Sequence, residues 1–184
     1  MTYTKDAIQL PDTYIGDYTY GVPIIDRLYL GCKLTIGKFC SIARNVTFAF
    51  WGKHQMGDIS TYPFCGFTEY GWRPVTRTEV FGEDTFVGND VWFASNALIL
   101  QGVTIGDGAV IGANSIVASN VRPYALVVGN PAREVRRRFS DENINKLMEI
   151  QWWNWSYENI NKYLQLISSP NIAELYEAWK NNIK

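Results

Sequence analysis

The chain of 184 residues has little net charge, a single histidine and no long apolar run. Its 17 basic and 18 acidic residues leave a formal charge of −1, which indicates neither a nucleic-acid partner nor an anionic membrane surface. No apolar run approaches the length of a membrane span, and residues 1–6 carry no apolar signal region. Cys32, Cys40 and Cys65 are odd in number. We therefore expect a cytoplasmic protein without disulfides and without insertion into a membrane.

What the chain does have is a six-residue repeat from Phe81 to Val128. In each hexad the first residue is large and apolar, the second is Gly or Ala with one exception, and the fifth is small or β-branched. A fixed short period of this kind predicts a β-solenoid, in which stacked coils share one core. The first positions are Phe81, Val87, Phe93, Ile99, Ile105, Ile111 and Val117.

The same repeat is present earlier in the chain, although less regularly. Cys40 occupies a fifth position of one of these hexads, so we expect its side chain to fill the core. The earlier hexads begin at Ile15, Leu30, Ile36 and Ile42.

The spacing between Phe48 and Phe81 is not a multiple of six, so the chain leaves the solenoid and returns to it. This excursion, residues 49–80, has no periodicity and is rich in aromatic residues. Long connections without regular structure tend to be functional or disordered, and the aromatic content disfavours disorder. We therefore predict a packed functional loop.

After the last hexads the periodicity becomes helical. Gly129–Pro131 is predicted to end the strands, and Ser140 and Ser156 are predicted N-caps of two helices. A third short helix is predicted around Leu175 and Trp179.

The predicted organisation is thus an all-β solenoid followed by a helical appendage. Residues 1–139 form the solenoid with its inserted loop at 49–80, and residues 140–184 form the helical extension. We expect the helices to cover an exposed end or flank of the solenoid.

Several motifs lie beside the repeat pattern: Ile36–Ile42, Gly52–His54, Ser60–Phe64, Val87–Trp92, Val128–Ala132, Arg138–Glu142 and Trp152–Trp155. Together with the hexads they resemble the xenobiotic acetyltransferase branch of the hexapeptide-repeat acyltransferases. That branch includes chloramphenicol and streptogramin acetyltransferases and many polysaccharide O-acetyltransferases. The resemblance implies a left-handed parallel β-helix, a homotrimer with active sites between subunits, and acetyl-CoA as acetyl donor to a small-molecule acceptor.

His54 falls on the position of the family's catalytic base, so the resemblance implies that it takes the proton of an acceptor hydroxyl. Imidazole, with an ordinary pKa of about 6.5, suits this task near neutral pH. The alternative is a surface histidine in a glycine-containing loop. Asp58, Glu69 or a main-chain carbonyl are the candidates for orienting the ring.

The resemblance also implies contacts between acetyl-CoA and small residues of the solenoid. Ser95 and Ala113 fall on positions that meet the pantetheine arm, and Ala118 falls near the nucleotide end. Relatives begin a Thr-Lys pair at the position of Ala118, and this chain has no lysine there. The alternative is that these small residues only permit tight turns.

Arg133 and Arg136 match basic residues near the CoA phosphates. Arginine suits phosphate recognition because its planar guanidinium presents several donors. For Arg137 and Arg138 we favour the alternative of a solvated basic run before a helix.

Aromatic residues of the excursion are candidates for the wall of the acceptor site, namely Trp51, Tyr62, Phe64 and Trp72. They equally suit anchoring of the loop to a neighbouring subunit. Antibiotic-modifying relatives carry a longer hairpin where this chain has the short span 21–29, which shifts the expectation from an antibiotic toward a sugar hydroxyl.

Other functions remain in competition with O-acetyl transfer. One is N-acetyl transfer to a nucleotide-linked amino sugar, and another is a non-catalytic trimeric scaffold. A zinc-dependent carbonic anhydrase on the same fold needs three histidine ligands, whereas this chain has one, so we predict no metal site.

Overall fold

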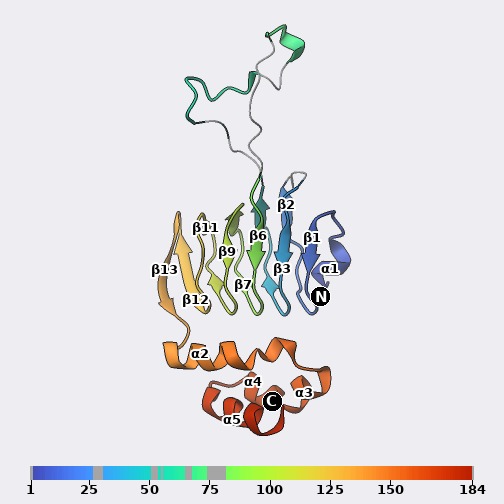
Figure 1. The fold of residues 1–184 in the computed structure, drawn as a ribbon, viewed down its shortest axis with the longest axis vertical. Coiled ribbons are helices and arrows are strands. Elements are labelled where there is room, and N and C mark those ends of the chain that lie inside the picture. Colours follow the sequence, from blue (N-terminus) through green and yellow to red (C-terminus); the bar gives the residue numbers. More distant parts are fainter. Residues whose placement is uncertain are drawn as a thin grey trace.

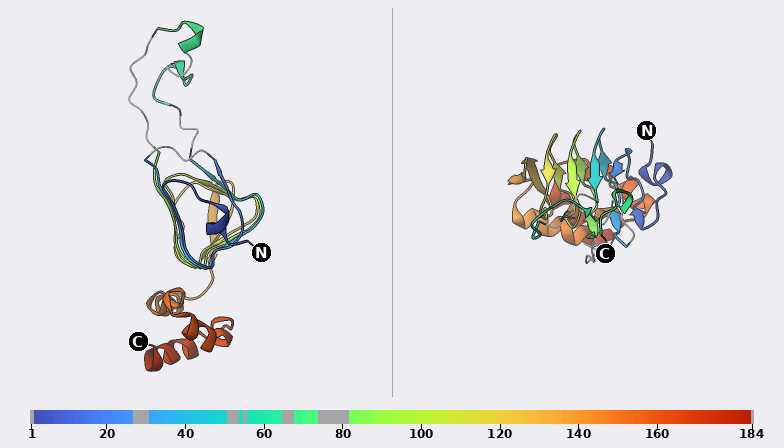
Figure 2. Two further views of the ribbon diagram at one scale, coloured as in Figure 1. Left: turned by 90° about the vertical axis from the view of Figure 1, so that its right-hand side faces the viewer. Right: turned by 90° about the horizontal axis from the view of Figure 1, so that it is seen from above.

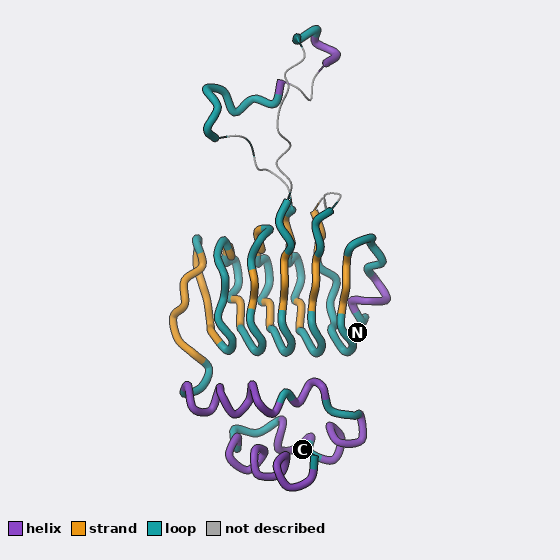
Figure 3. The backbone as a smooth tube through the Cα atoms, viewed as in Figure 1, coloured by secondary structure: helices purple, strands orange, loops and turns teal. Residues whose placement is uncertain are grey.

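The computed structural model describes residues 2–26, 31–50, 54, 56–64, 68–73 and 82–183, except for the side chain of Asn182. In this part of the chain three sheets enclose a triangular prism, and helices lie along one edge of it (Figures 1 and 2). Figure 3 shows that each coil of the prism alternates short strands with turns. The predicted combination of parallel strands and C-terminal helices is confirmed. None of the described helices is long and apolar enough to span a membrane.

The elements follow one another in a simple order. The strands are β1 (Thr13–Ile15), β2 (Ile24–Asp26), β3 (Leu34–Ile36), β4 (Ser41–Ile42), β5 (Thr47–Ala49), β6 (Thr85–Val87), β7 (Trp92–Phe93), β8 (Leu98–Leu100), β9 (Thr104–Ile105), β10 (Val110–Ile111), β11 (Ile116–Val117), β12 (Ala125–Gly129) and β13 (Ala132–Arg137). The helices are α1 (Thr4–Ala7), α2 (Asp141–Ile150), α3 (Tyr157–Lys162), α4 (Leu164–Ile167) and α5 (Ile172–Asn182), with 3₁₀ turns η2 (Thr68–Tyr70) and η3 (Trp152–Asn154).

Apart from the antiparallel pair β12–β13, strands that neighbour one another in a sheet belong to successive coils. The sheet orders are β1-β3-β6-β9, β13-β12-β10-β7-β4 and β11-β8-β5-β2. In the regular region Phe86 pairs with Thr104 and Trp92 with Val110, so one coil takes three hexads. The six-residue period of the sequence is therefore one side of the triangle.

The side chains at the first and fifth positions of the hexads face the interior of the prism. First positions such as Phe93 and Ile111 are fully buried, and so are fifth positions such as Ala97 and Ser115. Cys40 is buried as predicted, and burial raises the pKa of its thiol to about 12. Cys65 lies outside the described residues.

The second position is glycine where the backbones of successive coils meet. A Cβ atom on Gly37 would lie 2.5 Å from the carbonyl oxygen of Gly88. A Cβ atom does not fit at that distance. The backbone of the next coil therefore requires glycine at position 37.

The excursion leaves the register of all three sheets intact. Across it, β3 pairs with β6, β4 with β7 and β5 with β8, and all three pairs have the same offset in sequence. This offset is larger than the three hexads of a regular coil, such as the one that separates β6 from β9. All the extra residues therefore lie between β5 and β6.

One corner of the prism, which we call the helix-side corner, consists of Tyr18, Phe39, Asp90, Gly108 and Tyr124, all with left-handed backbone (φ +54° to +66°). The N–H of each later member donates to the carbonyl of the residue that directly precedes the member in the coil before it. For example, Tyr124 N–H donates to the carbonyl of Asp107, the residue before Gly108, at 2.8 Å.

The helices pack on the helix-side corner, and α2 runs alongside its row of turns (Figure 1). The rings of Phe39 and Trp152 are 4.8 Å apart, and those of Tyr124 and Phe139 are 5.8 Å apart. The helices therefore cover a flank of the solenoid, not its end. Ser140 and Ser156 cap α2 and α3 as predicted, each accepting a hydrogen bond from the backbone N–H three residues later.

The prediction that Gly129–Pro131 ends the strands is wrong. Asn130 and Pro131 form a turn, and β13 returns antiparallel to β12 along the edge of its sheet. Most of β13 is exposed, so its sequence lacks the apolar alternation by which a half-buried strand is recognised.

Gly108 is the position on the helix-side corner where a substitution tests this packing. Its φ is +66°, and an added Cβ would lie 2.4 Å from Cε1 of Tyr124. We expect Gly108→Ala to destabilise the fold by roughly 1–3 kcal/mol, because it combines backbone strain with overpacking.

Thermal unfolding followed by circular dichroism measures the effect. Gly57→Ala is the matched control, since no atom of the described residues lies within 4 Å of the place where its added methyl group would be. It should leave the midpoint unchanged. Equal midpoints for Gly108→Ala and the wild type would show that the corner tolerates displacement of Tyr124.

Candidate active site

The histidine is held by the main chain of its own loop. His54 Nδ1 lies 2.6 Å from the carbonyl oxygen of Thr61. A carbonyl only accepts, so this contact assigns a proton to Nδ1, and Nε2 is the ring nitrogen that takes no part in it. Of the three orienting groups that the sequence left open, the structure has the main-chain carbonyl in contact with the ring.

A local turn presents that carbonyl to the histidine. The Ser60 hydroxyl oxygen accepts a hydrogen bond from Tyr62 N–H at 3.1 Å, and Phe64 N–H donates to the Tyr62 carbonyl at 3.0 Å. Serine favours such turns because its side chain bonds to nearby backbone.

Three of the four aromatic candidates are gathered beside this turn. The rings of Tyr62 and Phe64 are 4.7 Å apart, and Trp72 meets Phe64 edge-on at 5.3 Å. Tyr62 and Trp72 remain 42% and 48% exposed, so both present surface to a further partner. Trp51 lies outside the described residues.

The described part of the excursion stands clear of its own solenoid, on the side opposite the helices (Figures 1 and 2). It exposes large apolar side chains: Met56 is 90% exposed and Ile59 is fully exposed. The histidine loop is thus separated from the solenoid surfaces that carry the other candidates.

Ser95 and Ala113 lie together at a second corner of the prism. They occupy equivalent positions of successive coils, and the Ser95 carbonyl accepts a hydrogen bond from the N–H of Asn114 at 3.1 Å. Asn45, Asn96 and Asn114 form a side-chain ladder along this corner, with amide contacts of 3.0 and 3.2 Å.

Ala118 is not part of that group. It follows β11 at the next corner of the prism, and its side chain is exposed. The structure therefore brings two of the three small candidates together and places the third on a different edge.

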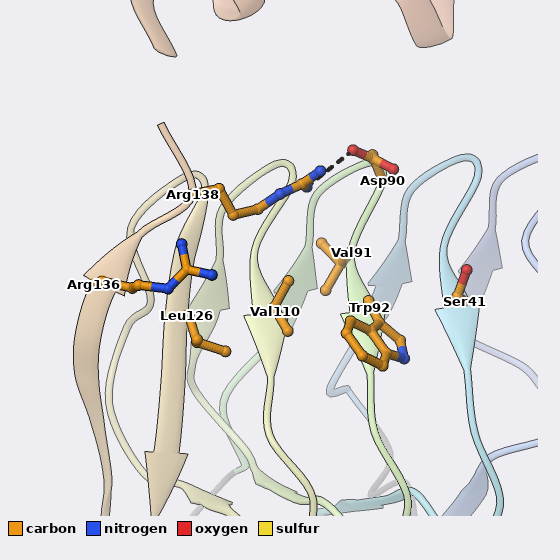
Figure 4. Close-up of a pocket in the computed structure, with 8 residues that line it drawn as sticks. All are labelled: Ser41, Asp90, Val91, Trp92, Val110, Leu126, Arg136 and Arg138. Carbon is orange, nitrogen blue, oxygen red and sulfur yellow. Dashed lines mark hydrogen bonds and ion pairs between the residues drawn. The ribbon is translucent and has the colours of Figure 1, made fainter. Parts of the chain in front are cut away.

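A pocket lies on the outer face of the sheet formed by β4, β7, β10, β12 and β13, with a volume of about 350 Å³ (Figure 4). Its floor is one register row, with one residue from each strand. The row consists of Ser41, Trp92, Val110, Leu126 and Arg136. We call it the sheet-face pocket.

Arg136 lines the sheet-face pocket, whereas Arg133 pairs with Val128 at the other end of the hairpin. Both guanidinium groups are exposed and bond only to neighbouring main-chain carbonyls among the described residues, at 3.2 and 3.0 Å. They are therefore available to an anionic ligand.

An ion pair closes the pocket at the helix-side corner. Arg138 Nη1 lies 3.3 Å from Asp90 Oδ2 and donates to the Gly108 carbonyl at 2.8 Å (Figure 4). Burial raises the pKa of the Asp90 carboxyl, although Arg138 opposes the rise.

The prediction of a solvated basic run is wrong for Arg138 and Arg137. Arg138 is about two-thirds buried, and Arg137 lies 3.6 Å from Asp141 with its side chain 19% exposed. The carboxylate that Arg138 contacts is 48 residues earlier in the chain, so local sequence gives no sign of the pair.

Trp92 is a site residue that the sequence reasoning missed. It lies at the centre of the pocket row and is 53% exposed. An outward-facing hexad position with a large aromatic residue is the signal that marks it, because such a side chain has no role in the core.

No group of three or more His, Cys, Asp and Glu side chains suited to a metal is found among the described residues.

Comparison with known proteins adds to this geometry. Residues 84–119 match the family model described as bacterial transferase hexapeptide (six repeats). The chain is 49% identical over 145 residues to a probable macrolide acetyltransferase of Lysinibacillus sphaericus, covering 77% of this chain and 80% of that protein. It is 41% identical over 153 residues to a chloramphenicol acetyltransferase of Agrobacterium fabrum, covering 82% of this chain and 73% of that protein.

Among solved structures, the chain is similar to a hexapeptide-repeat acetyltransferase of Vibrio cholerae in complex with acetyl coenzyme A. The TM-score is 0.54 at 28% sequence identity, over 71% of this chain. The chain spans 62% of that structure's length, less than two thirds.

The Asp90–Arg138 pair predicts a pH-dependent loss of stability in Arg138→Met. Removing the guanidinium leaves Asp90 without the group that lowers its pKa, so its folded-state pKa rises further above the unfolded value. We expect a loss of about 1–2 kcal/mol at pH 7, below the roughly 3–5 kcal/mol of a fully buried pair.

The direction of the pH dependence follows from which protonation form of Asp90 the folded variant disfavours. The penalty applies to the ionised carboxylate, so it is present at neutral pH and vanishes as the pH falls toward about 4. The deficit of Arg138→Met in thermal midpoint, measured from pH 7.5 to pH 4, should shrink as the pH falls and leave only the part that comes from the lost hydrogen bond to the Gly108 carbonyl. Arg136→Met, from the same pocket, should match the wild type throughout, and a pH-independent deficit would contradict the ion-pair account.

Proposed function

Because the chain belongs to the hexapeptide-repeat acetyltransferases, we propose that it moves an acetyl group from acetyl-CoA to a hydroxyl of a small acceptor, with His54 as general base. The observation that carries the proposal is the contact between His54 Nδ1 and the Thr61 carbonyl, 2.6 Å long. It supports a ring that carries a proton on Nδ1, so that Nε2 is the nitrogen left to act as the base.

In the proposed reaction His54 Nε2 takes the proton of the acceptor hydroxyl while that oxygen attacks the thioester carbonyl. The new C–O bond forms, the C–S bond breaks, and the imidazolium returns the proton to the CoA thiolate. The Thr61 carbonyl holds the ring in place and stabilises its positive charge meanwhile.

The active site is completed by another subunit of a homotrimer. In support, the histidine loop stands away from its own solenoid and exposes Met56 and Ile59. Exposed apolar side chains rimmed by polar surface mark protein contacts. The left-handed sense of the coil is part of the same proposal.

Acetyl-CoA lies along the solenoid surface in this proposal. Ser95 and Ala113 adjoin its pantetheine arm, Ala118 adjoins the nucleotide end, and Arg133 and Arg136 contact its phosphates. The exposure of both arginines and the proximity of Ser95 to Ala113 support the assignment.

Tyr62, Phe64 and Trp72, with Trp51, wall the acceptor site. The names of the relatives favour an antibiotic, whereas the short span 21–29 favours a sugar hydroxyl. A screen of chloramphenicol, a macrolide, simple hexosides and a nucleotide-linked amino sugar, read by release of free CoA thiol, separates these acceptors. Acetylation of the amine alone would replace O-transfer by N-transfer.

His54→Ala tests the catalytic assignment. We expect acetyl transfer to fall by about 10²- to 10⁴-fold, the usual contribution of a positioned base, while thermal midpoint and oligomeric state stay unchanged. Glu69→Gln, a conservative change in the same loop, should retain the wild-type rate. Wild-type activity in His54→Ala would favour the scaffold function or another base.

Acetyl-CoA should stabilise the folded protein. At one hundred times its Kd the ligand adds about 2.7 kcal/mol, which corresponds to a rise of roughly 5–10 °C in thermal midpoint. Arg136→Met should weaken binding about tenfold through loss of a phosphate contact, and Lys162→Met, on α3, should not. A midpoint that does not respond to millimolar acetyl-CoA would contradict the cofactor assignment.

A further inference from the structure

Ser41 lies at the end of the sheet-face pocket opposite Arg136 (Figure 4). It belongs to β4, the last strand in the order of its sheet, and it neighbours Trp92 in the register row. Ile42, the other residue of β4, is buried in the core, so Ser41 faces outward and lines the pocket. The pocket floor thus ends in a hydroxyl group.

The Ser41 hydroxyl is a hydrogen-bond donor without a partner in the described part of the chain. The main chain of Ser41, in contrast, is fixed, because its N–H donates to the Val91 carbonyl at 2.9 Å as part of the pairing between β4 and β7. The hydrogen of a hydroxyl group rotates to suit an acceptor. Ser41 therefore presents a well-placed donor to a ligand that occupies this end of the pocket.

Three other polar side chains lie near this end of the pocket. Arg138 Nη1 lies 3.3 Å from Asp90 Oδ2 and donates to the Gly108 carbonyl, so the two charged groups are engaged with each other. The indole N–H of Trp92 has no hydrogen-bond partner among the described residues, and Figure 4 shows its nitrogen on the side of the ring toward β4. Adjacent strands thus present two uncharged donors, from Ser41 and Trp92.

The residues assigned to acetyl-CoA under the proposed function point its thioester toward this end. They follow one direction along the solenoid, from the phosphate end at β13, through Ala113 just after β10, to Ser95 just after β7. Since β10 pairs with β7 and β7 with β4, each step is one coil. One further step in the same direction reaches β4 and Ser41.

The length of the pantetheine arm agrees with this direction. Successive strands are about 4.8 Å apart, so β4 lies about 14 Å from β12. The Arg136 guanidinium extends toward Leu126 of β12 (Figure 4). From diphosphate to sulfur, the arm is as long as roughly four residues of extended polypeptide, or about 13–14 Å. An extended arm whose phosphates contact Arg136 therefore places its thioester over β7 and β4.

We propose that the Ser41 hydroxyl donates a hydrogen bond to the carbonyl oxygen of the acetyl group and stabilises the oxyanion that forms there, with the Trp92 indole N–H as second donor. This inference rests on the proposed acetyl transfer. When the acceptor oxygen bonds to the thioester carbon, its proton passes to His54 and the C=O π electrons move to the carbonyl oxygen. The C=O bond forms again as the C–S bond breaks, and the thiolate takes the proton from His54.

The surroundings of the two donors suit this task. The apolar floor of the pocket, with Val110 and Leu126, limits the access of water, and donors placed in advance are most effective where water is excluded. A free carboxylate beside a developing oxyanion would oppose it. The contact of Asp90 with Arg138 offsets that negative charge.

Steady-state kinetics of Ser41→Ala test the assignment, with an acceptor found by the screen above. We expect kcat to fall about 10²-fold, as loss of one oxyanion donor produces, while KM for acetyl-CoA stays within about twofold of the wild type. Thr35→Val is the matched control, because it removes a hydroxyl from the outward position of β3 in the adjacent sheet, and it should keep the wild-type kcat. An unchanged kcat in Ser41→Ala, or a loss confined to KM for the acceptor, would overturn the assignment.

Infrared spectroscopy of bound acetyl-CoA, isotopically labelled at the carbonyl carbon, needs neither acceptor nor turnover. A hydrogen bond to a carbonyl lowers its stretching frequency, so the frequency should rise in Ser41→Ala and in Trp92→Phe and stay at the wild-type value in Thr35→Val. Either of the first two variants at the wild-type frequency would overturn the role of its donor.

The outcomes also separate this inference from the function on which it rests. A wild type that does not bind acetyl-CoA, or a His54→Ala variant with full activity, would contradict the proposed function. A large loss in His54→Ala together with wild-type kinetics in Ser41→Ala would contradict the role of Ser41 alone.

Discussion

Backbone hydrogen bonds between successive coils determine where every other feature of this protein lies. Each regular coil pairs with the next at an offset of three hexads in all three sheets, so side chains at equivalent positions stack into continuous rows. Inside the prism these rows are apolar and form the core. On the outside they form continuous surface rows, such as the row from Ser41 to Arg136 that floors the sheet-face pocket and the ladder of Asn45, Asn96 and Asn114.

The sequence was sufficient for the parts of the fold that depend on local periodicity. The hexads predicted the parallel strands, and Ser140 and Ser156 predicted two helix starts, because a repeat and a cap are both short-range patterns. The sequence did not predict β13, since an exposed edge strand held by pairing with β12 carries no apolar pattern. Residues 132–137 form a strand because they pair with β12, and not because of their own strand propensity.

The candidate site shows the same division. Composition and resemblance marked His54, Tyr62, Phe64 and Trp72, and the structure gathers these four in one loop. The carbonyl that orients the imidazole has no side-chain signature, so the sequence left it open. The pairing of Asp90 with Arg138 was also not predictable, because it depends on how two distant segments meet at one corner. Ion pairs between distant segments and hydrogen bonds to main-chain groups could not be predicted from the sequence.

The insertion between β5 and β6 is absorbed entirely at one corner, since all three sheets have the same offset across it. An insertion within a strand would turn core side chains outward, whereas one at this corner changes no pairing. Loop and coil are therefore separable modules. Exchange or lengthening of the loop therefore alters what stands beside His54 while the prism keeps its register.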